Sequence, residues 1–85
     1  MEIYTTPRFD RSYKKLPVDI KNKAKAREVI FKYNPFDARL STHKLHGKRK
    51  DEWAYSVDYS YRIVFIFLED NKILYLDIGT HKELY

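Results

Sequence analysis

The chain has 85 residues, of which 17 are Lys or Arg and 12 are Asp or Glu, so its formal net charge is +5. This length allows one domain, residues 1–85, with a small core. The absence of cysteine excludes a disulfide scaffold, a thiolate metal site and a cysteine nucleophile. No apolar run approaches the length of about 18 residues that a membrane span needs, and the N-terminus lacks the apolar stretch of a signal peptide. The composition therefore predicts a cytoplasmic basic domain.

The N-terminal part predicts a short strand and a first helix. Residues 3–5 are typical of a strand, and Thr6 followed by Pro7 is typical of a helix start, with Thr6 as the N-cap. Apolar residues then recur at helical spacing, which indicates one buried stripe: Phe9, Tyr13 and Leu16.

Residues 18–33 predict a second helix, which Asn34-Pro35 ends because a residue before proline resists the helical conformation. Arg27 interrupts the row of positions 20, 24, 27 and 31, so the apolar stripe is imperfect. The apolar residues noted on this helix are Ile20, Ala24, Val29, Ile30 and Tyr33.

After a polar segment without period, residues 36–52, the pattern predicts three strands. Residues 53–59 alternate between apolar and polar positions. Residues 61–68 are apolar on both faces, which indicates a central strand. Residues 69–71 predict a turn, and residues 73–78 a third strand that Gly79 ends. The order β-α-α-β-β-β predicts an α+β domain with two N-terminal helices packed on an antiparallel sheet, which the opening strand joins.

The positive charge is concentrated in the first half of the chain. Residues 1–33 hold nine Lys/Arg against four Asp/Glu, whereas residues 53–85 hold three against five. A further basic cluster precedes the predicted strands: Lys44, Lys48, Arg49 and Lys50. Two interpretations are equally favoured by charge alone, a surface that binds a polyanion such as RNA and a solvated helix face.

Several kinds of active site are missing. Two glycines cannot build the common phosphate-binding loops, and no zinc-protease motif is present. His43 and His46 are three residues apart, but no carboxylate pair completes a metal site, so no metal and no cofactor are expected. The remaining cations, histidines and tyrosines suit metal-free cleavage of RNA by its own 2′-hydroxyl group. That reaction needs a base, a cation for the charge on the phosphorane, and an acid for the leaving oxygen.

Single residues in the strand region leave alternatives open. Arg62 is the lone charge of an apolar strand, so it either pairs with a structural carboxylate such as Asp58 or Asp77 or faces a site for an anion. His81 follows a strand end and is either a functional residue or an ordinary exposed histidine. Tyr85 suits a hydrophobic plug, a stacking surface or a proton relay. Trp53 is favoured as a core residue.

Three segments resemble the RelE/ParE superfamily of type II toxins. They are His43-Lys44-Leu45-His46-Gly47, then Tyr61-Arg62-Ile63-Val64-Phe65, and the C-terminal Ile78-Gly79-Thr80-His81-Lys82-Glu83-Leu84-Tyr85. Their order and spacing are similar over essentially the whole chain, and the predicted element order is similar too. Each motif is weak alone, and together they identify the family resemblance.

The resemblance implies a fold and an activity. The C-terminal segment is similar to that of YafQ-like, ribosome-dependent endoribonucleases, which implies site roles for His81 and Tyr85. The resemblance likewise implies a phosphate-binding role for Arg62 and an acid–base role for His43, with His46 as the alternative if the register of the motif is shifted. Basic residues near the site would then hold mRNA or ribosomal RNA: Lys44, His46, Lys48, Arg49 and Lys50. ParE-like members, which inhibit DNA gyrase without cutting RNA, are the alternative.

The chain departs from the YafQ-like pattern near Ser56, where a second histidine is absent, and near Ser60-Tyr61, where an Asp-Trp pair is absent. The resemblance also implies partners. A small basic domain suits an acidic, partly disordered antitoxin segment that folds on its surface. Messenger and ribosomal RNA in the ribosomal A site would be the substrate and its surroundings, and operator DNA would be contacted only through the antitoxin. No membrane partner is expected.

Overall fold

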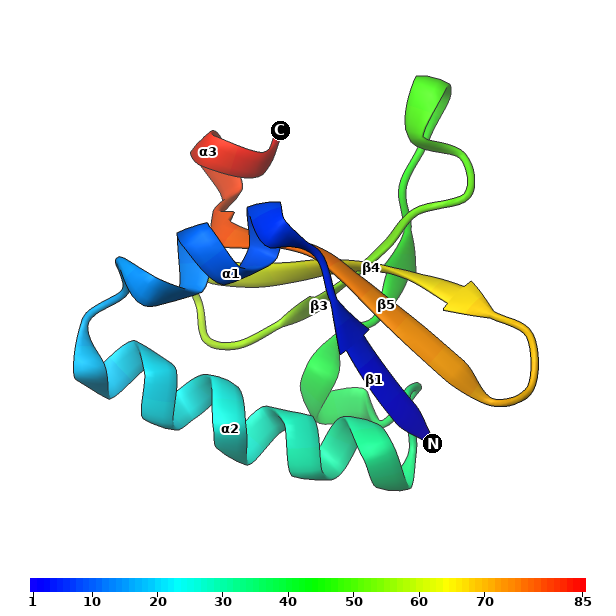
Figure 1. Ribbon diagram of the computed structural model, residues 1–85, viewed down its shortest axis with the longest axis horizontal. Coiled ribbons are helices and arrows are strands. Elements are labelled where there is room, and N and C mark those ends of the chain that lie inside the picture. Colours follow the sequence, from blue (N-terminus) through cyan, green and yellow to red (C-terminus); the bar gives the residue numbers. More distant parts are fainter.

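In the computed structural model, which describes residues 1–85, three α-helices accompany a five-stranded sheet (Figure 1). The strands are β1 (Glu2–Thr5), β2 (His43–Lys44), β3 (Trp53–Ser56), β4 (Tyr61–Leu68) and β5 (Lys72–Thr80). The helices are α1 (Pro7–Lys14), α2 (Val18–Tyr33) and α3 (His81–Leu84), and two 3-10 turns span Ala38–Leu40 and Gly47–Arg49.

The strand order is β1-β5-β4-β3-β2, which makes β4 the central strand, as predicted. All neighbouring pairs are antiparallel except β1 and β5, which are parallel, so the sheet is mixed. The α+β class and the β-α-α-β-β-β order of the main elements are confirmed. The parallel pairing follows from the intervening chain, because α1, α2 and three strands separate β1 from β5 and allow it to run in the same direction.

The elements differ from the sequence prediction in several places. The strand predicted at residues 53–59 ends at Ser56, and Tyr59 is 96% exposed in the following turn. Strand β5 continues through Gly79 to Thr80. Strand β2 and helix α3 were not predicted, because two or four residues are too few to show a period.

The turn between β4 and β5 contains two consecutive left-handed residues, Asp70 with φ 60° and Asn71 with φ 59°. Tight hairpins need positive φ at such positions, and Asp and Asn tolerate it better than other non-glycine residues. This explains how the hairpin closes without glycine.

Helix α1 begins as the sequence predicts and is tied to the sheet at its first turn. The Thr6 hydroxyl oxygen accepts a hydrogen bond from the Phe9 N–H at 3.1 Å and lies 3.1 Å from the carbonyl oxygens of both Tyr75 and Leu76. The N-cap of α1 is thus also a contact to β5.

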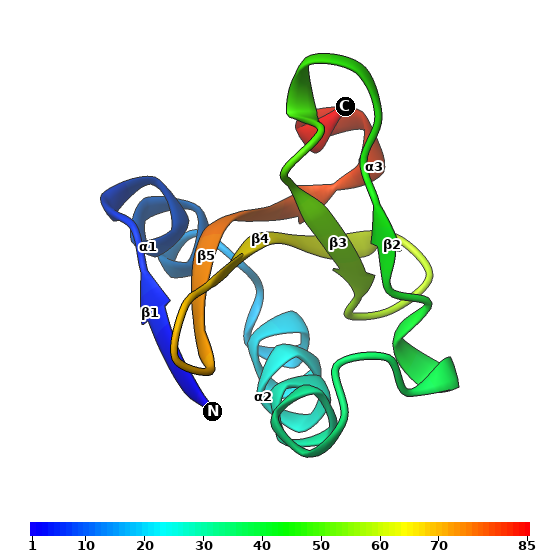
Figure 2. The ribbon, with the colours of Figure 1, turned by 90° about the vertical axis from the view of Figure 1, so that its right-hand side faces the viewer.

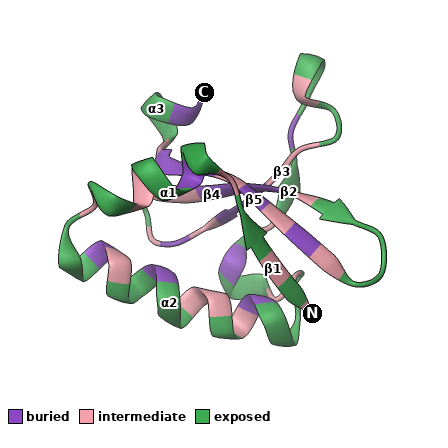
Figure 3. Ribbon diagram, in the orientation of Figure 1, coloured by how far each residue is buried: buried purple, intermediate pink, exposed green.

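The main core lies between α1, α2 and one face of the sheet. Helix α2 lies on one side of the sheet, while α3 and the segment after β2 lie on the other (Figure 2). Buried residues concentrate in the central strands and recur along α2 (Figure 3). A second, smaller cluster lies under α3 on the opposite face and contains Leu45, Ala54, Val64 and Leu84.

Phe31 is the centre of the main core. Its ring is fully buried, with ring centroids 4.6 Å from Tyr55, 4.9 Å from Phe65 and 6.2 Å from Tyr75. The hydroxyl groups of Tyr55 and Tyr75 hydrogen-bond to each other at 2.7 Å, so neither is buried without a partner. Burial is the main reason that the pKa of both phenols is raised above its ordinary value.

The buried face of α2 differs from the predicted stripe. Val29 and Tyr33 are 70% and 94% exposed, and the buried residues are Ile20, Ala24 and Phe31. The row that Arg27 interrupts is therefore the core-facing row. Arg27 is accommodated there because its long side chain reaches out of the core, where Nη1 donates to the Arg39 carbonyl at 2.8 Å.

Truncating Phe31 tests this arrangement. We expect Phe31→Ala to lower the free energy of unfolding by about 3–5 kcal/mol, because a buried aromatic ring is lost and its cavity cannot close. Val29→Ala, on the same helix but exposed, is the control and should change it by less than about 0.5 kcal/mol. Urea unfolding measures both, and equal losses would contradict the assigned core face.

Candidate active site

The strand register places two of the predicted site residues, Arg62 and His43, on the face of the sheet opposite α2. Arg62 of β4 lies directly opposite Gly79 of β5 and Ser56 of β3. His43 of β2 lies opposite Ala54, two residues from Ser56, so alternation puts His43 and Arg62 on the same face. Two strand spacings and two residues separate them, roughly 12 Å between Cα atoms. Both long side chains can therefore reach a common ligand.

Helix α3 brings His81 and Tyr85 together. The Thr80 hydroxyl accepts from the Glu83 N–H, and the Glu83 carboxylate accepts from the Thr80 N–H at 2.8 Å, which is a complete capping box. The Tyr85 N–H donates to the His81 carbonyl at 3.0 Å. As a result the two rings meet edge to face, with their centroids 4.5 Å apart.

Close packing of α3 against β5 depends on Gly79. A Cβ atom at this position would lie 3.2 Å from Glu83 Oε1 and 3.4 Å from its Cβ. A larger residue here would require the Glu83 side chain to shift slightly, and that side chain is part of the capping box of α3.

Arg62 makes no ion pair, so the predicted alternative of a structural carboxylate partner is wrong. Its Nη1 donates to the carbonyl oxygens of Asp58 at 2.6 Å, Tyr61 at 3.0 Å and Tyr59 at 3.1 Å. These contacts fix the guanidinium against the turn between β3 and β4. Nε and Nη2 make no hydrogen bond to the protein and remain available to a ligand.

Asp58 and Asp77, the carboxylates that the sequence suggested as partners of Arg62, make other contacts. Asp58 accepts hydrogen bonds from the backbone N–H groups of Ser60 and Tyr61 and pairs with Lys23 at 3.3 Å. Partial burial raises the pKa of Asp58, but these hydrogen bonds and Lys23 outweigh it, so the net shift is downward. Asp77 pairs with Arg8 of α1 at 3.1 Å.

Tyr85 lies against Arg49, and the charge of Arg62 also reaches its phenol. Its side chain is about half exposed, and burial is the main influence on its phenol, raising the pKa above the ordinary value of 10.0. The positive charges of Arg49 and Arg62 act in the opposite direction and more weakly. The Tyr85 hydroxyl is therefore protonated at neutral pH, which makes it a hydrogen-bond and proton donor.

The basic segment after β2 contains one restrained cation and several free ones. Arg49 Nε donates to Glu52 at 2.9 Å, Nη1 donates to the Leu84 carbonyl at 2.6 Å, and its guanidinium carbon lies 5.7 Å from the Tyr85 ring centroid. Arg49 thus connects this segment to α3. His46, Lys48 and Lys50 are exposed and make no ion pair.

Two other predicted residues lie on β2 and point in opposite directions. Lys44 is opposite Trp53, and its ammonium lies 6.0 Å from the indole centroid, on the face that carries the main core. Lys44 is therefore separated from the other basic residues. His43 Nδ1 lies 3.0 Å from the Ser41 carbonyl, which can only accept, so Nδ1 carries the hydrogen and Nε2 can accept a proton.

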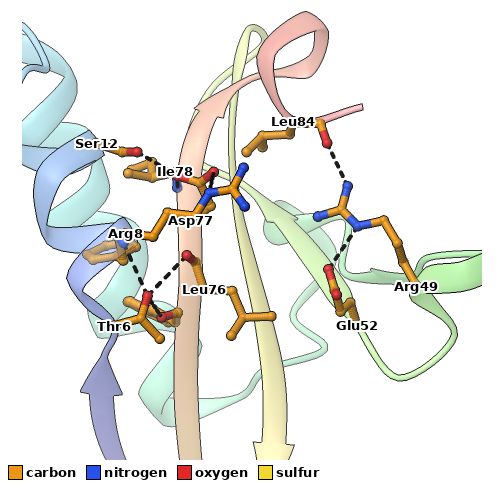
Figure 4. Close-up of polar contacts among 11 residues, drawn as sticks. Thr6, Arg8, Ser12, Arg49, Glu52, Leu76, Asp77, Ile78 and Leu84 are labelled. Carbon is orange, nitrogen blue, oxygen red and sulfur yellow. Dashed lines mark hydrogen bonds and ion pairs between the residues drawn. The ribbon is translucent and has the colours of Figure 1, made fainter.

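Sequence reasoning missed a polar network at the edge of the site (Figure 4). Asp77 is only 9% exposed, accepts from the Ser12 hydroxyl at 2.7 Å and the Ile78 N–H at 2.9 Å, and pairs with Arg8. One signal was present in the sequence. Arg8 is a cation in the first turn of a helix, where the helix dipole favours acidic residues, so it needed a compensating carboxylate.

No three His, Asp or Glu side chains converge in a way that could hold a metal ion. None of the helices has the length and apolar character that a membrane span requires. The groups that meet at the site are His81, Tyr85 and the neighbouring arginines.

Comparison with solved structures identifies the fold as that of RelE- and YafQ-type toxins. No family model matches the sequence, and no curated protein matches it. The resemblance that the three sequence motifs indicated is thus supported at the level of tertiary structure, at identities of 20% or less in the structures described below.

Individual structures superpose along nearly the whole chain. YafQ from Escherichia coli strain BL21(DE3) has a TM-score of 0.82 at 20% identity, covering 99% of this chain and 97% of that one. In the E. coli DinJ–YafQ toxin–antitoxin complex the TM-score is 0.80 at 20% identity, with 99% and 96% covered. A YoeB/ParE toxin from Agrobacterium tumefaciens has a TM-score of 0.80 at 15% identity, covering 95% of this chain and 99% of that one. The archaeal RelE–RelB complex from Pyrococcus horikoshii OT3 has a TM-score of 0.74 at 17% identity, covering 93% of this chain and 92% of that one.

The capping box of α3 makes the His81–Tyr85 contact dependent on pH. Hydrogen bonds from Thr80 lower the pKa of Glu83 below its ordinary value of 4.5. Because the folded pKa is the lower one, stabilisation of α3 is complete above pH 4.5 and is lost as the pH falls through the folded pKa. We expect nuclear Overhauser effects between the His81 and Tyr85 rings to persist at pH 5 and to weaken at lower pH.

Glu83→Gln is the matched control for this prediction, because its amide oxygen can still accept the Thr80 hydrogen bond but does not titrate. Its ring contact should show no loss over the same acid range. An identical loss in both proteins would show that another group controls α3.

Proposed function

We propose that this protein is the toxin of a type II toxin–antitoxin system, and that it is a ribosome-dependent endoribonuclease that cleaves mRNA by metal-free transesterification. The observation that carries the proposal is the assembly of Arg62, His81 and Tyr85 at one end of the sheet, next to Arg49. The fold shared with YafQ and RelE supports the same class.

Each step of the reaction has a suitable group. The RNA 2′-oxygen attacks the adjacent phosphorus, a P–O bond to the 5′-oxygen breaks, and the products are a 2′,3′-cyclic phosphate and a 5′-hydroxyl. Arg62 holds the phosphate through Nε and Nη2, because its Nη1 is occupied by backbone carbonyls. A restrained guanidinium loses little freedom when it binds, which favours the charged transition state.

Protons are exchanged by His81, Tyr85 and His43. A histidine accepts the 2′-hydroxyl proton, because a neutral imidazole nitrogen is a proton acceptor. His81 is the first candidate because it contacts Tyr85, and His43 is the second because its Nε2 is free. Tyr85 stays protonated and donates to the leaving 5′-oxygen or orients a base against its ring.

Basic residues around the site hold the RNA. Lys48 and Lys50 are exposed beside Arg49, and His46 is exposed at the start of the same turn. Such side chains bind phosphates of mRNA or ribosomal RNA without sequence preference. Lys44 contributes only if RNA extends around the edge strand β2.

The proposed partner is a cognate antitoxin with an acidic, partly disordered segment. The chain carries a net charge of +5, and several large apolar side chains are exposed, among them Phe36 at 57% and Phe67 at 40%. These two rings form one exposed aromatic cluster, since the ring centroids of Phe36 and Phe67 lie 6.0 Å apart. The structures of YafQ with DinJ and of RelE with RelB support a partner of this kind.

Substitution of the site residues tests the proposed activity. We expect His81→Ala and Arg62→Ala each to lower mRNA cleavage on translating ribosomes by at least about 10²-fold, because a proton-transfer group or the phosphate ligand is lost. Primer extension on a reporter mRNA locates and quantifies the cuts. Lys25→Ala, which removes an exposed cation of α2 away from the site, is the control and should cleave normally.

The same expression experiment separates the rival functions. Intact mRNA together with induction of the DNA-damage response would instead indicate a ParE-like gyrase inhibitor. Normal growth without any antitoxin would indicate a protein that has lost its toxicity.

Removal of a single oxygen tests the role of Tyr85. Tyr85→Phe keeps the ring against His81 but lacks the proton donor, so kcat should fall about 10²-fold while KM stays unchanged. Because the Tyr85 pKa is raised above 10.0, the wild-type rate should show no loss from its ionisation below that pH. Equal activity of wild type and Tyr85→Phe in single-turnover assays would leave Tyr85 only a stacking role.

A further inference from the structure

A groove of about 470 Å³ crosses the open face of the sheet beside the candidate active site, between α1 and the segment after β2. Leu76 and Leu84 form its apolar floor. Arg8 and Arg49 stand on its opposite sides, and their guanidinium groups point toward each other across it (Figure 4). Arg8 has no part in the chemistry described above.

Arg8 is held in place by a buried carboxylate. Its Nε lies 3.1 Å from Asp77 Oδ2, while Asp77 Oδ1 is fixed by the Ser12 hydroxyl at 2.7 Å and by the Ile78 N–H at 2.9 Å. The two Nη atoms of Arg8 make no hydrogen bond to the protein. The charged end of an otherwise exposed side chain is therefore directed into the groove.

Arg49 is held in the corresponding way from the other side. Its Nε donates to Glu52 and its Nη1 to the Leu84 carbonyl, which leaves the donors of Nη2 unused. Asp77 and Glu52 balance the charges of Arg8 and Arg49, so the groove itself has little net charge. An anion is therefore bound there mainly through hydrogen bonds from the N–H donors that remain free. The net charge of the whole chain, +5, supplies the long-range attraction.

The unused donors suit a phosphodiester. Its two free oxygens can accept N–H bonds from the planar Nη pair of Arg8 and from Nη2 of Arg49, which are held in a fixed arrangement. The groove also adjoins the candidate active site, because Arg49 lines the groove and lies 5.7 Å from the Tyr85 ring centroid, and Arg62 is opposite Gly79 just before α3. A strand bound at Arg62 can thus pass Tyr85 and enter the groove.

We propose that this groove is a second phosphate-binding site for single-stranded RNA, in which Arg8 and Arg49 hold a phosphate beside the one that Arg62 binds. The identity of the ligand as RNA rests on the proposed function. The groove then fixes the direction of the strand across the site, since a second contact removes the rotation that a single phosphate contact allows.

Binding of an RNA hexamer that cannot be cleaved, because every 2′-hydroxyl is methylated, tests the proposal without requiring catalysis. Fluorescence anisotropy measures its affinity for the purified protein over a range of salt concentrations. Arg8→Gln should weaken binding roughly tenfold at low salt, because charge-assisted hydrogen bonds are lost. It should also reduce the slope of log K against log salt by about 0.7, the value of one phosphate contact with a single strand.

Arg11→Gln is the matched control, because it removes the same charge from the same helix outside the groove. The salt slope of this variant should equal that of the wild type. Arg8→Lys keeps a cation beside the buried Asp77, so this variant does not leave that carboxylate unpaired. It should retain the salt slope but bind the hexamer more weakly, since lysine lacks the planar pair of donors. Thermal melting confirms that each variant is folded.

Two outcomes would overturn the proposal. The first is an equal effect of Arg8→Gln and Arg11→Gln on affinity and slope, which would reduce Arg8 to general surface charge. The second is Arg8-dependent binding of an oligoglutamate peptide without binding of the hexamer, which would assign the groove to an acidic protein segment. If binding of the hexamer depends on Arg8 but the wild-type protein cleaves no mRNA, the proposed function is contradicted. The assignment of the groove as a phosphate-binding site is still supported.

Discussion

The pairing of β4 with strands on both sides is the constraint on which the rest of the structure depends. Its alternate residues face different environments: Ile63 and Phe65 enter the main core, whereas Arg62 and Val64 face the opposite side. A slip of one residue would exchange these sets and place a guanidinium among the aromatic rings around Phe31. The core therefore fixes the register, and the register fixes the position of Arg62.

Helix α3 is stabilised by contacts at both ends, because four residues cannot form a stable helix alone. The Thr80–Glu83 capping box satisfies its start, and Arg49 satisfies the Leu84 carbonyl near its end. Leu84 anchors it in the smaller core cluster. The relation of His81 to Tyr85 is thus set by the local capping box and by one contact from Arg49, a residue far away in the chain.

The positive charge of the chain divides into two kinds. Lys48 and Lys50 extend into solvent and act over distance, whereas the three arginines at the candidate site and the groove have their guanidinium groups held by the protein. Arg62 is held by backbone carbonyls, Arg49 by Glu52 and the Leu84 carbonyl, and Arg8 by Asp77. Mobile cations raise the local concentration of a polyanion, and held ones determine how it is oriented. Net charge alone could not distinguish these roles.

The sequence by itself determined the elements with clear local signals. Thr6-Pro7 marked the start of α1, Asn34-Pro35 the end of α2, and the apolar run of residues 61–68 the central strand. Motif order also indicated the fold. Local pattern could not choose Phe31 over Val29 for the core, because a helix shows its buried face only when the sheet lies against it.

Tertiary structure alone decided the partners of the charged residues. The sequence suggested Asp58 and Asp77 as ion-pair partners of Arg62. In the structure Asp77 pairs with Arg8, and Arg62 donates hydrogen bonds to backbone carbonyls. It also brings Arg49 to Tyr85, 36 positions further along the chain, and places Arg8 across a groove from it. Such pairings depend on long-range strand register and helix docking, which set distances of a few ångströms that no local pattern encodes.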